Sequence, residues 1–421
     1  MTARRSKLSH ALTMGALIVA GEAIFALPFV IPRVFRPTLL EVWNIDHTTL
    51  GAAFSAYGLV AMVSYGLGGP LADRFPTRVM MAVALLCTAA GGAVAASGPS
   101  GPTLGLLYAG WGASTILLFW AGMLRATREW GGADAQGRAY GLLDGGRGLV
   151  AALFGTLAVA AFAALGGGDE ARQAQAFRGV VWGATGLTVL AAAGVWWFVP
   201  EPPPSERRRF RWADLGPLAR RPTLWLQALI VVCAYVAYKG TDDVSQLVRD
   251  VLGASEVEAA SVGTLAIWLR PVGAIGAGFL ADRLGGWRTV AGGFALLLVA
   301  DLAVVAGVAS VLPVVLVGGL VATALAVYAL RGVYFSLLAE GAVPVALTGT
   351  AVGLVSVIGY TPDVFFGPMM GVLLDRSPGA AGHRDLFAVL AAFAGAGLLA
   401  SLAFGWFAGN AQAEADSRSM P

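Results

Sequence analysis

The stretch Gly-Pro-Leu-Ala-Asp-Arg at residues 69–74 decides the fold, because the chain nearly repeats it as Gly-Phe-Leu-Ala-Asp-Arg at residues 278–283. The aspartates of the two copies lie 209 positions apart in a chain of 421 residues. Each copy follows a long apolar run and is soon followed by a further arginine, Arg78 or Arg288. A charged turn that recurs at half-chain spacing between apolar runs is typical of membrane proteins built from two related halves.

The composition is that of a membrane protein. Hydrophobic residues make up 57% of the chain and charged residues 13%, whereas a soluble domain carries about 25% charged residues. The 57 glycines suit transmembrane helices that pack through small side chains. Cys87 and Cys233 both fall inside apolar runs, so no disulfide is expected. The basic residues sit mainly in short connections, which argues against a nucleic-acid surface.

Twelve apolar runs are long enough to cross a bilayer, which takes about 20 helical residues. They lie at 11–35, 48–71, 78–96, 102–125, 138–165, 177–199, 222–247, 259–281, 289–309, 312–338, 346–374 and 385–408. The sequence therefore predicts an all-α membrane protein with twelve transmembrane helices in two pseudo-symmetric six-helix bundles. The expected organisation is an N-terminal half at 1–199, a basic linker at 200–221, a C-terminal half at 222–409 and a polar tail at 410–421.

The basic residues also orient the predicted spans. With the N-terminus placed in the cytoplasm, the cytoplasmic segments hold more than twice as many Lys and Arg residues as the external segments. Cytoplasmic loops of membrane proteins carry such an excess. No small-residue cleavage site follows the first run, so we expect it to stay as a helix. We therefore expect a multi-pass protein of the cell (inner) membrane with both termini in the cytoplasm.

The twelve spans and the repeated motif resemble those of the major facilitator superfamily. The first copy, together with Arg78, looks like the superfamily's signature between helices two and three, and the second copy is similar to its partial repeat between helices eight and nine. Val-Pro-Glu-Pro-Pro at 199–203 is similar to the ending of helix six in that family. The first copy departs from the pattern at Phe75-Pro76, where the family usually has a residue and Gly.

The resemblance implies that the repeated motif is a cytoplasmic gate, whose aspartate latches the halves in the outward-open state. The expected gate residues are Gly69, Asp73, Arg74, Arg78, Gly278, Asp282 and Arg283. They are expected to control conformational change and not to select the cargo. Glu129 and Glu340 lie 211 positions apart, close to the repeat spacing, so we expect them to share a structural role at helix ends.

Several charged residues lie too deep in the apolar runs to be solvated turns. An ionisable residue inside the bilayer costs about 2.5–3.5 kcal/mol on insertion scales, so each is a candidate for function. These residues are Glu22, Asp144, Arg147, Lys239, Arg270, Arg331 and Asp363. The resemblance implies that all of them lie on helices that surround the transport cavity. Asp301, in the ninth span, is the exception, and we expect it to lie near the external end or to pair locally.

The four deep cations favour a small organic anion as the cargo, because a guanidinium presents a rigid fork that suits a carboxylate or a phosphate. Arg270 is the first candidate for the anion contact, since it stands alone in an apolar stretch before Pro271. Arg331 and Arg147 are expected to assist Arg270 in binding the anion. Lys239 and Tyr57 complete the candidate substrate contacts.

The deep acids are candidates for proton coupling. Glu22, Asp363 and Asp144 are the residues expected to carry the proton, because burial favours the protonated form of a carboxyl group. The expected function is therefore secondary transport by alternating access of a carboxylate, sugar acid or organophosphate, coupled to protons as in a symporter.

Structural roles remain open for some of these residues. Asp144 and Arg147 have the alternative of neutralising one another as a structural pair. Lys239 has the alternative of reaching the external interface and pairing with Asp242 or Asp243. Arg331 has the alternative of an acidic partner on the seventh or eleventh span.

Two rival functions also remain open. One is a proton-driven exporter of lipophilic or cationic compounds, with Glu22 and Asp363 as recognition groups. The other is a transporter-like sensor that binds a ligand and signals through the linker. The stretches 118–132 and 141–148 weakly resemble bacterial permeases of the sugar-phosphate-permease-like, organic anion branch.

Enzyme chemistry has no support in the sequence. It contains no Gly-rich phosphate loop, no His-Glu-x-x-His motif and no Gly-x-Ser-x-Gly elbow. We therefore expect no cofactor and no metal site. The expected partners are a small-molecule substrate, protons and the lipid bilayer, with the chain acting as a monomer and without nucleic acid.

Overall fold

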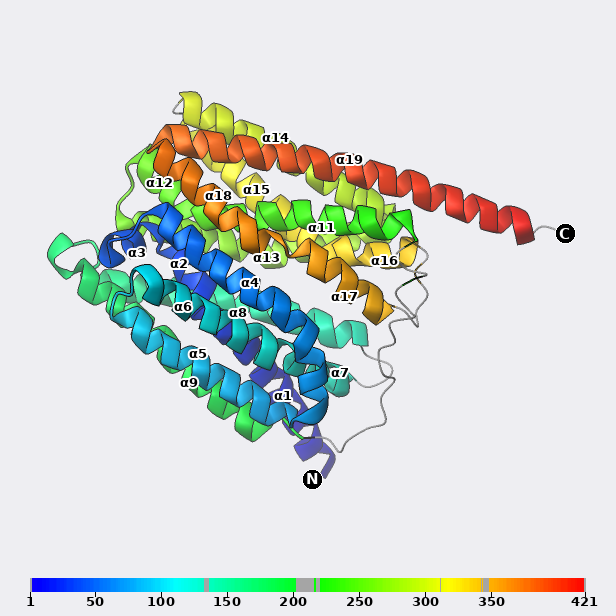
Figure 1. Ribbon diagram of the computed structural model, residues 1–421, viewed down its shortest axis with the longest axis horizontal. Coiled ribbons are helices and arrows are strands. Elements are labelled where there is room, and N and C mark those ends of the chain that lie inside the picture. Colours follow the sequence, from blue (N-terminus) through cyan, green and yellow to red (C-terminus); the bar gives the residue numbers. More distant parts are fainter. Residues whose placement is uncertain are drawn as a thin grey trace. The chain divides into compact units, whose positions relative to one another are not determined.

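The computed structural model describes residues 2–131, 136–201, 216, 220–310, 312–341, 343 and 348–419, and these residues contain helices and no strand (Figure 1). Most of the predicted linker therefore lies outside the described residues. Eleven helical segments of the described part are long and apolar enough to cross a membrane. The remaining predicted span, 48–71, coincides with the 28-residue helix α4 (His47–Arg74), some of whose side chains lie outside the described residues.

The chain forms two compact units. Unit 1 comprises Met1–Ser205, Asp242–Trp268 and Asp363–Asp375, and unit 2 comprises Glu206–Thr241, Leu269–Pro362 and Arg376–Pro421. The helices of unit 1 are α1 (Thr2–Phe25), η1 (Ala26–Val30), α2 (Ile31–Val34), α3 (Arg36–Trp43), α4, α5 (Thr77–Ala96), α6 (Gly101–Gly112), η2 (Ala113–Trp120), α7 (Ala121–Gly131), α8 (Gln136–Ala164), α9 (Glu170–Phe198) and α12 (Val244–Leu252).

The helices of unit 2 are α11 (Pro222–Gly240), α14 (Gly286–Ser310), α15 (Pro313–Val333), η5 (Tyr334–Ser336), α16 (Leu337–Glu340), α17 (Thr348–Gly359) and α19 (Ala380–Ser419). Two long helices, α13 (Glu256–Leu284) and α18 (Pro362–Arg376), contribute residues to both units, as does the short turn η4 (Thr241–Asp243). The predicted division into halves at 1–199 and 222–409 stays a prediction.

Unit 1 is held together by close helix packing. Helices α5 and α9 lie side by side (Figure 1). Gly92 on α5 allows this approach, since a Cβ at that position would lie 2.2 Å from the hydroxyl oxygen of Thr185 on α9. Buried apolar side chains of α1, among them Leu17 and Ile24, complete this part of the core. Small residues at such contacts let helices approach closely in a membrane, where no hydrophobic force drives them together.

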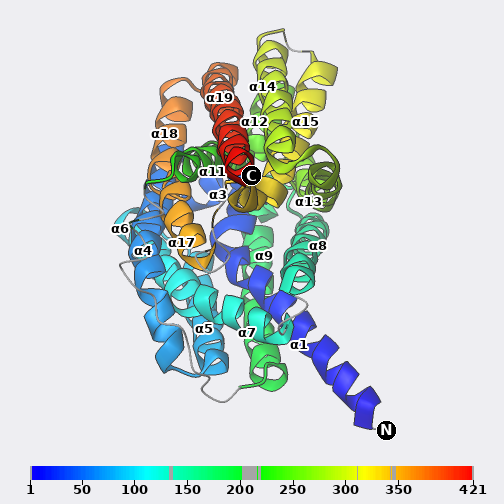
Figure 2. The ribbon, with the colours of Figure 1, turned by 90° about the vertical axis from the view of Figure 1, so that its right-hand side faces the viewer.

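Unit 2 is built around α14. This helix packs against α15 and α19 (Figure 2). Phe294 and Leu297 on α14 are fully buried and belong to one apolar cluster with Leu330 on α15 and Phe404 on α19. The same helix carries Asp301, which is fully buried and accepts a 2.8 Å hydrogen bond from Thr323 on α15. Asp301 therefore pairs locally, which was one of the two expectations for it.

Carboxylates from distant parts of the chain cap three helix N-termini. Glu201 accepts hydrogen bonds of 3.0 Å from the backbone amides of Thr77 and Arg78 at the start of α5. In unit 2, Glu340 binds the first two amides of α14, and in unit 1 Asp375 binds the first two amides of α4. A negative charge is favourable at these positions because the free amides and the helix dipole both attract it.

The expected shared role of Glu129 and Glu340 is not what the structure shows. The helices α5 and α14 begin at equivalent places in the two halves, but Glu201 caps the first and Glu340 the second. Glu129 instead accepts a 2.9 Å hydrogen bond from Arg125, one turn earlier on α7. Repeat spacing alone therefore does not identify equivalent caps.

This difference gives a prediction about stability. Replacing Glu340 by Gln is expected to lower the free energy of unfolding by about 1 kcal/mol, as for the loss of other N-terminal caps. Replacing Glu129 by Gln should cost only about 0.3–0.5 kcal/mol, because it removes an exposed pair within one helix. Thermal unfolding of the two purified variants measures the difference. Equal losses of unfolding free energy in both variants would mean that the cap at α14 stabilises the protein no more than the exposed Arg125–Glu129 pair does.

Candidate functional site

The first cluster of charges at membrane depth lies in unit 1 and joins α8 to α1. Arg147 Nε lies 3.4 Å from a carboxylate oxygen of Glu22 and donates a 2.9 Å hydrogen bond to the backbone oxygen of Gly21. Only 6% of the surface of Glu22 is exposed. Asp144, one turn before Arg147 on α8, is exposed and lies 4.0 Å away. Glu22 is therefore the main ionic partner of Arg147.

Two π-helical turns surround this ion pair. Phe25 directly precedes η1 and Trp120 ends η2, and the Arg147 guanidinium carbon lies 5.5 Å and 5.8 Å from the centres of their rings. A π-helical turn inserts an extra residue into a helix and is frequent at functional sites. Gly21 leaves room for the arginine, since a Cβ there would lie 3.0 Å from Arg147 Cδ.

The second cluster lies in unit 2 around Arg331 on α15. The guanidinium carbon lies 3.9 Å from the centre of the Tyr238 ring and 5.7 Å from that of Tyr235, both on α11. Tyr334 and Tyr360 are the other ionisable side chains that act most strongly on it. Within the described residues, no carboxylate forms an ion pair with Arg331, and its buried Nη1 has no hydrogen-bond partner.

The tyrosines around Arg331 form a connected group. The ring centres of Tyr235 and Tyr360 lie 4.8 Å apart, and the hydroxyl oxygens of Tyr334 and Tyr360 lie 3.4 Å apart. Aromatic faces carry negative electrostatic potential, so they stabilise a cation without neutralising its charge. We call Arg331, Tyr235, Tyr238, Tyr334 and Tyr360 the tyrosine cage. It brings one of the predicted cations together with side chains able to donate hydrogen bonds.

Four other predicted site residues are not members of these two clusters. Lys239, on α11, is only 2% exposed, and Arg270, on α13 before Pro271, is half-buried; each has interactions within the protein. Tyr57 is buried on α4, where its hydroxyl group lies 2.7 Å from that of Thr115. Asp363 is buried in the first turn of α18.

The gate motif is only partly described. The side chains of Gly69, Asp73 and Arg74 lie outside the described residues, although their backbone is part of α4. Arg78 lies over the ring of Trp196 at 5.1 Å. In the second copy, Gly278 lies within α13, and Asp282 and Arg283 are exposed near the end of that helix.

A third cluster of charges lies at the end of the first span. Arg33 Nε donates a 2.6 Å hydrogen bond to Asp242, and both side chains are buried. These residues lie 209 positions apart, which is the spacing of the repeated motif. Residues at equivalent positions of two repeats touch only near the axis that relates the repeats. The sequence signal for this pair is that Arg33 and Asp242 have opposite charges at the spacing of the repeated motif.

The surroundings of the Arg33–Asp242 pair are also ionic. Arg36 is fully buried, and burial lowers its pKa while Asp243, Asp242 and Asp375 oppose that effect. Ser245 donates a 3.0 Å hydrogen bond to the backbone oxygen of Arg33. This network binds the segment after the first span to residues of the seventh span and to the end of α18.

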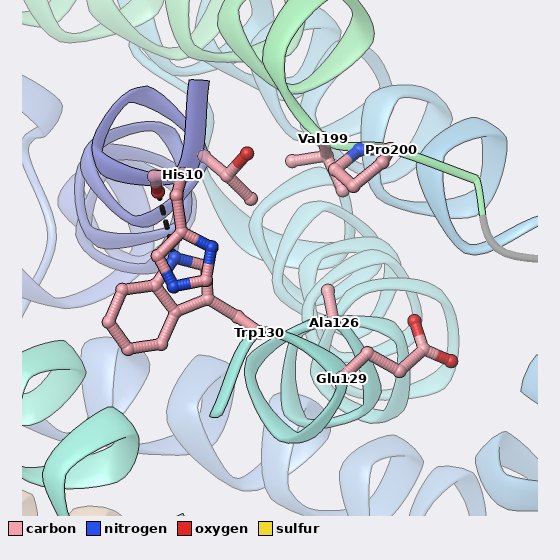
Figure 3. Close-up of a pocket in the computed structure, with 7 residues that line it drawn as sticks. His10, Ala126, Glu129, Trp130, Val199 and Pro200 are labelled. Carbon is pink, nitrogen blue, oxygen red and sulfur yellow. Dashed lines mark hydrogen bonds between the residues drawn. The ribbon is translucent and has the colours of Figure 1, made fainter. Parts of the chain in front are cut away.

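One pocket of unit 1 is lined by His10, Thr13, Ala126, Glu129, Trp130, Val199 and Pro200 (Figure 3). The rings of His10 and Trp130 are stacked with their centres 4.2 Å apart, and the Glu129 carboxylate points away from them. The volume of this pocket, about 210 Å³, is below the usual range for a ligand pocket. Its polar groups do not converge, so it is a poor candidate for the substrate site. The described residues also contain no cluster of His, Cys, Asp and Glu able to hold a metal ion.

Comparison with known proteins places this arrangement in a family. The sequence profile described as Major Facilitator Superfamily matches residues 16–362. The "Inner membrane protein YihN" of Escherichia coli (strain K12) is 25% identical over 403 residues, which cover 92% of this chain and 93% of that protein.

Solved structures agree with the family assignment. A bacterial homolog of the human lysosomal transporter Spinster, crystallised in an inward-facing and occupied conformation, gives a TM-score of 0.74 at 19% identity, covering 96% of this chain and 97% of the other. A D-xylose-proton symporter gives 0.72 at 17% identity, covering 94% and 96%. At these identities the structures show the fold alone, and they confirm the predicted all-α architecture. This chain belongs to the Major Facilitator Superfamily and is a membrane transporter.

Proposed function

We propose that the protein moves a small organic anion across the inner membrane by alternating access, in symport with protons. Arg331 is the primary anion contact. Both termini lie in the cytoplasm and the monomer is the working unit.

One observation carries the proposal. Arg331 is a cation at membrane depth whose described surroundings are tyrosine rings and not carboxylates. It lies nine residues before the end of the span Pro313–Glu340, which corresponds to roughly 14 Å along the helix. A charge in this position is expensive unless it is compensated. An anionic cargo supplies the compensation each time the site is occupied.

The Glu22–Arg147 pair supports proton coupling. The Glu22 carboxylate attracts the Arg147 guanidinium, whose Nε lies 3.4 Å from it. Protonation of Glu22 would remove the negative charge and with it this attraction. The π-helical turns beside Phe25 and Trp120 give the surrounding helices local irregularities at which the backbone can adjust. Proton coupling is also named for the D-xylose-proton symporter, which shares this fold.

The same pair argues against the cationic exporter. In that function Glu22, together with Asp363, is an expected recognition group for a cation. In the structure its carboxylate already faces Arg147. A positively charged drug would have to compete with a guanidinium that is part of the protein.

A thermal-shift screen of the purified protein tests the proposed function. The screen contains carboxylates, sugar acids, sugar phosphates and cationic drugs. Ligands that bind the folded state raise its melting temperature by mass action, and saturation at 100 times Kd adds about 2.7 kcal/mol of stability. We expect anions to stabilise the protein and cations to have no effect. Stabilisation by cationic drugs alone would favour the exporter.

Proton coupling gives a separate prediction. Replacing Glu22 by Gln mimics the protonated side chain, so anion uptake into proteoliposomes should no longer increase with an inward proton gradient. Exchange of internal for external anion, which needs no net proton movement, should continue. Replacing Asp144 by Asn is the matched control, because Asp144 is exposed and farther from Arg147. If Asp144→Asn loses the gradient dependence and Glu22→Gln keeps it, the roles of the two acids are reversed.

A further inference from the structure

We infer that the tyrosine cage accepts an anion whose head group carries a single negative charge, such as a carboxylate, in preference to a phosphate dianion. This inference rests on the proposed function and narrows its substrate class.

The other basic side chains with described ionic contacts are matched by acids. Arg147 faces Glu22, and Arg33 faces Asp242. Arg249, in α12, pairs with both Glu41 and Glu256. Lys239 and Arg270 have interactions of their own within the protein. For Arg331, the described residues supply the aromatic rings of Tyr235 and Tyr238 in place of an acid.

The donors of Arg331 suit a planar head group with two oxygens. Its contacts with the rings of Tyr238 and Tyr235 consume none of the five N–H donors of the guanidinium. Nη1 is buried and has no hydrogen-bond partner in the described part of the protein. A carboxylate accepts two parallel hydrogen bonds from such a fork. The neighbouring hydroxyl groups of Tyr334 and Tyr360 are potential donors to the same ligand.

Charge balance then favours a monoanion. The tyrosine cage contains one cationic side chain, so Arg331 and one carboxylate form a neutral complex within it. A phosphate dianion would leave one negative charge uncompensated among aromatic rings at membrane depth. Burying an unpaired charge carries a large free-energy penalty. The tyrosine hydroxyls are neutral donors and do not remove that charge.

Calorimetric titration of the purified wild-type protein at pH 7.5 tests this inference. The ligands form three matched sets, each with a neutral, a carboxylate and a phosphate member. The sets are glycerol, glycerate and glycerol 3-phosphate; glucose, glucuronate and glucose 6-phosphate; and benzyl alcohol, benzoate and benzyl phosphate. Within every set that binds, we expect the carboxylate to bind at least tenfold more tightly than the phosphate. A phosphate that binds as tightly as its carboxylate, or more tightly, would overturn the inference and leave the proposed anion transport intact.

A change of pH separates charge from shape. The second ionisation of a phosphate ester has a pKa of about 6, so at pH 5 most of the ester is a monoanion. The affinity for each phosphate should rise relative to that for its carboxylate, by about fivefold or more between pH 7.5 and pH 5. An unchanged ratio would mean that head-group shape and not charge sets the preference, and would contradict the charge argument. If no anion of the three sets binds while a neutral member does, the proposed function itself fails.

Replacing Arg331 by Lys tests the role of the fork. Lysine keeps the charge but presents a point cation in place of a planar fork. We expect the variant to keep the preference for the monoanion and to bind the carboxylate about tenfold more weakly, the effect of losing one charged hydrogen bond. Wild-type affinity in Arg331→Lys would show that the charge alone is recognised. Loss of the preference for the monoanion in this variant would contradict the charge argument.

Discussion

Replacing Arg331 by Gln is expected to weaken anion binding by at least about 100-fold. The substitution removes the cation and its paired donors, and each hydrogen bond to a charged group contributes about 1.5–3 kcal/mol. Two such bonds correspond to a factor of 100 or more, since 1.4 kcal/mol is a factor of ten. Glutamine is shorter than arginine but polar, and Tyr238 and Tyr235 would remain in place. Calorimetric titration with the anion that binds wild-type protein most tightly measures the loss.

Replacing Arg384 by Gln is the matched control for this variant. Arg384 also belongs to unit 2 but is exposed, and its ionic contact is with the adjacent Asp385 at 3.5 Å. The control should bind the anion as wild type does. If Arg331→Gln kept wild-type affinity while its melting temperature and monodispersity were also unchanged, Arg331 would not contact the cargo, and Arg270 would again be the first candidate.

Breaking the Arg33–Asp242 pair is expected to destabilise the protein by about 3–5 kcal/mol, because removing one partner leaves a buried charge uncompensated. Replacing Arg33 by Ala or Asp242 by Ala should each produce this loss. The charge-swapped variant Arg33→Asp/Asp242→Arg should recover at least half of it, since the two positions are equivalent in the repeats and the reversed pair keeps its neighbours. Thermal or denaturant unfolding of the single, double and swapped variants gives the coupling energy.

The exposed pair Arg125–Glu129 is the comparison for the coupling energy of Arg33 and Asp242. It has a similar contact distance of 2.9 Å but lies within one helix near solvent. Its coupling energy should be about 0.3–0.5 kcal/mol. A coupling energy of the same size for Arg33 and Asp242 would show that their contact contributes no more than a surface pair does.

The architecture was predictable because it depends on features that repeat along the chain. The length of each apolar run predicts whether it can span a bilayer as a helix. The copies of the motif at 69–74 and 278–283 indicate where the two related halves correspond along the chain. The same spacing also separates Arg33 from Asp242, which form a buried ion pair in the structure.

The partners of the deep charges were less predictable. Glu22 and Arg147 lie on different helices, so their contact depends on how α1 and α8 pack and on the space left by Gly21. The exposed Asp144 is nearer to Arg147 in sequence, and its spacing of three residues predicts an ion pair between them. Local spacing on a helix identifies side chains that share a face, but not which face meets an opposite charge on another helix.

The choice between Arg270 and Arg331 illustrates the same limit. Arg270 stood out because its neighbours in the sequence are apolar and Pro271 follows it. Arg331 stands out in the structure because aromatic residues from other helices surround it. Tyr235 and Tyr238 are about one turn apart and so share a face of α11, but nothing in the sequence brings that face to Arg331.

The most direct test of the account is a flux measurement on the wild-type protein in liposomes. Labelled forms of the tightest-binding anion and of its uncharged analogue are presented outside vesicles loaded with unlabelled compound, with Arg331→Gln liposomes as the background. The account predicts saturable uptake of the anion by wild type, little uptake of the neutral analogue, and loss of anion uptake in the variant. Equal uptake of the anion and its neutral analogue, unchanged by the loss of Arg331, would contradict it.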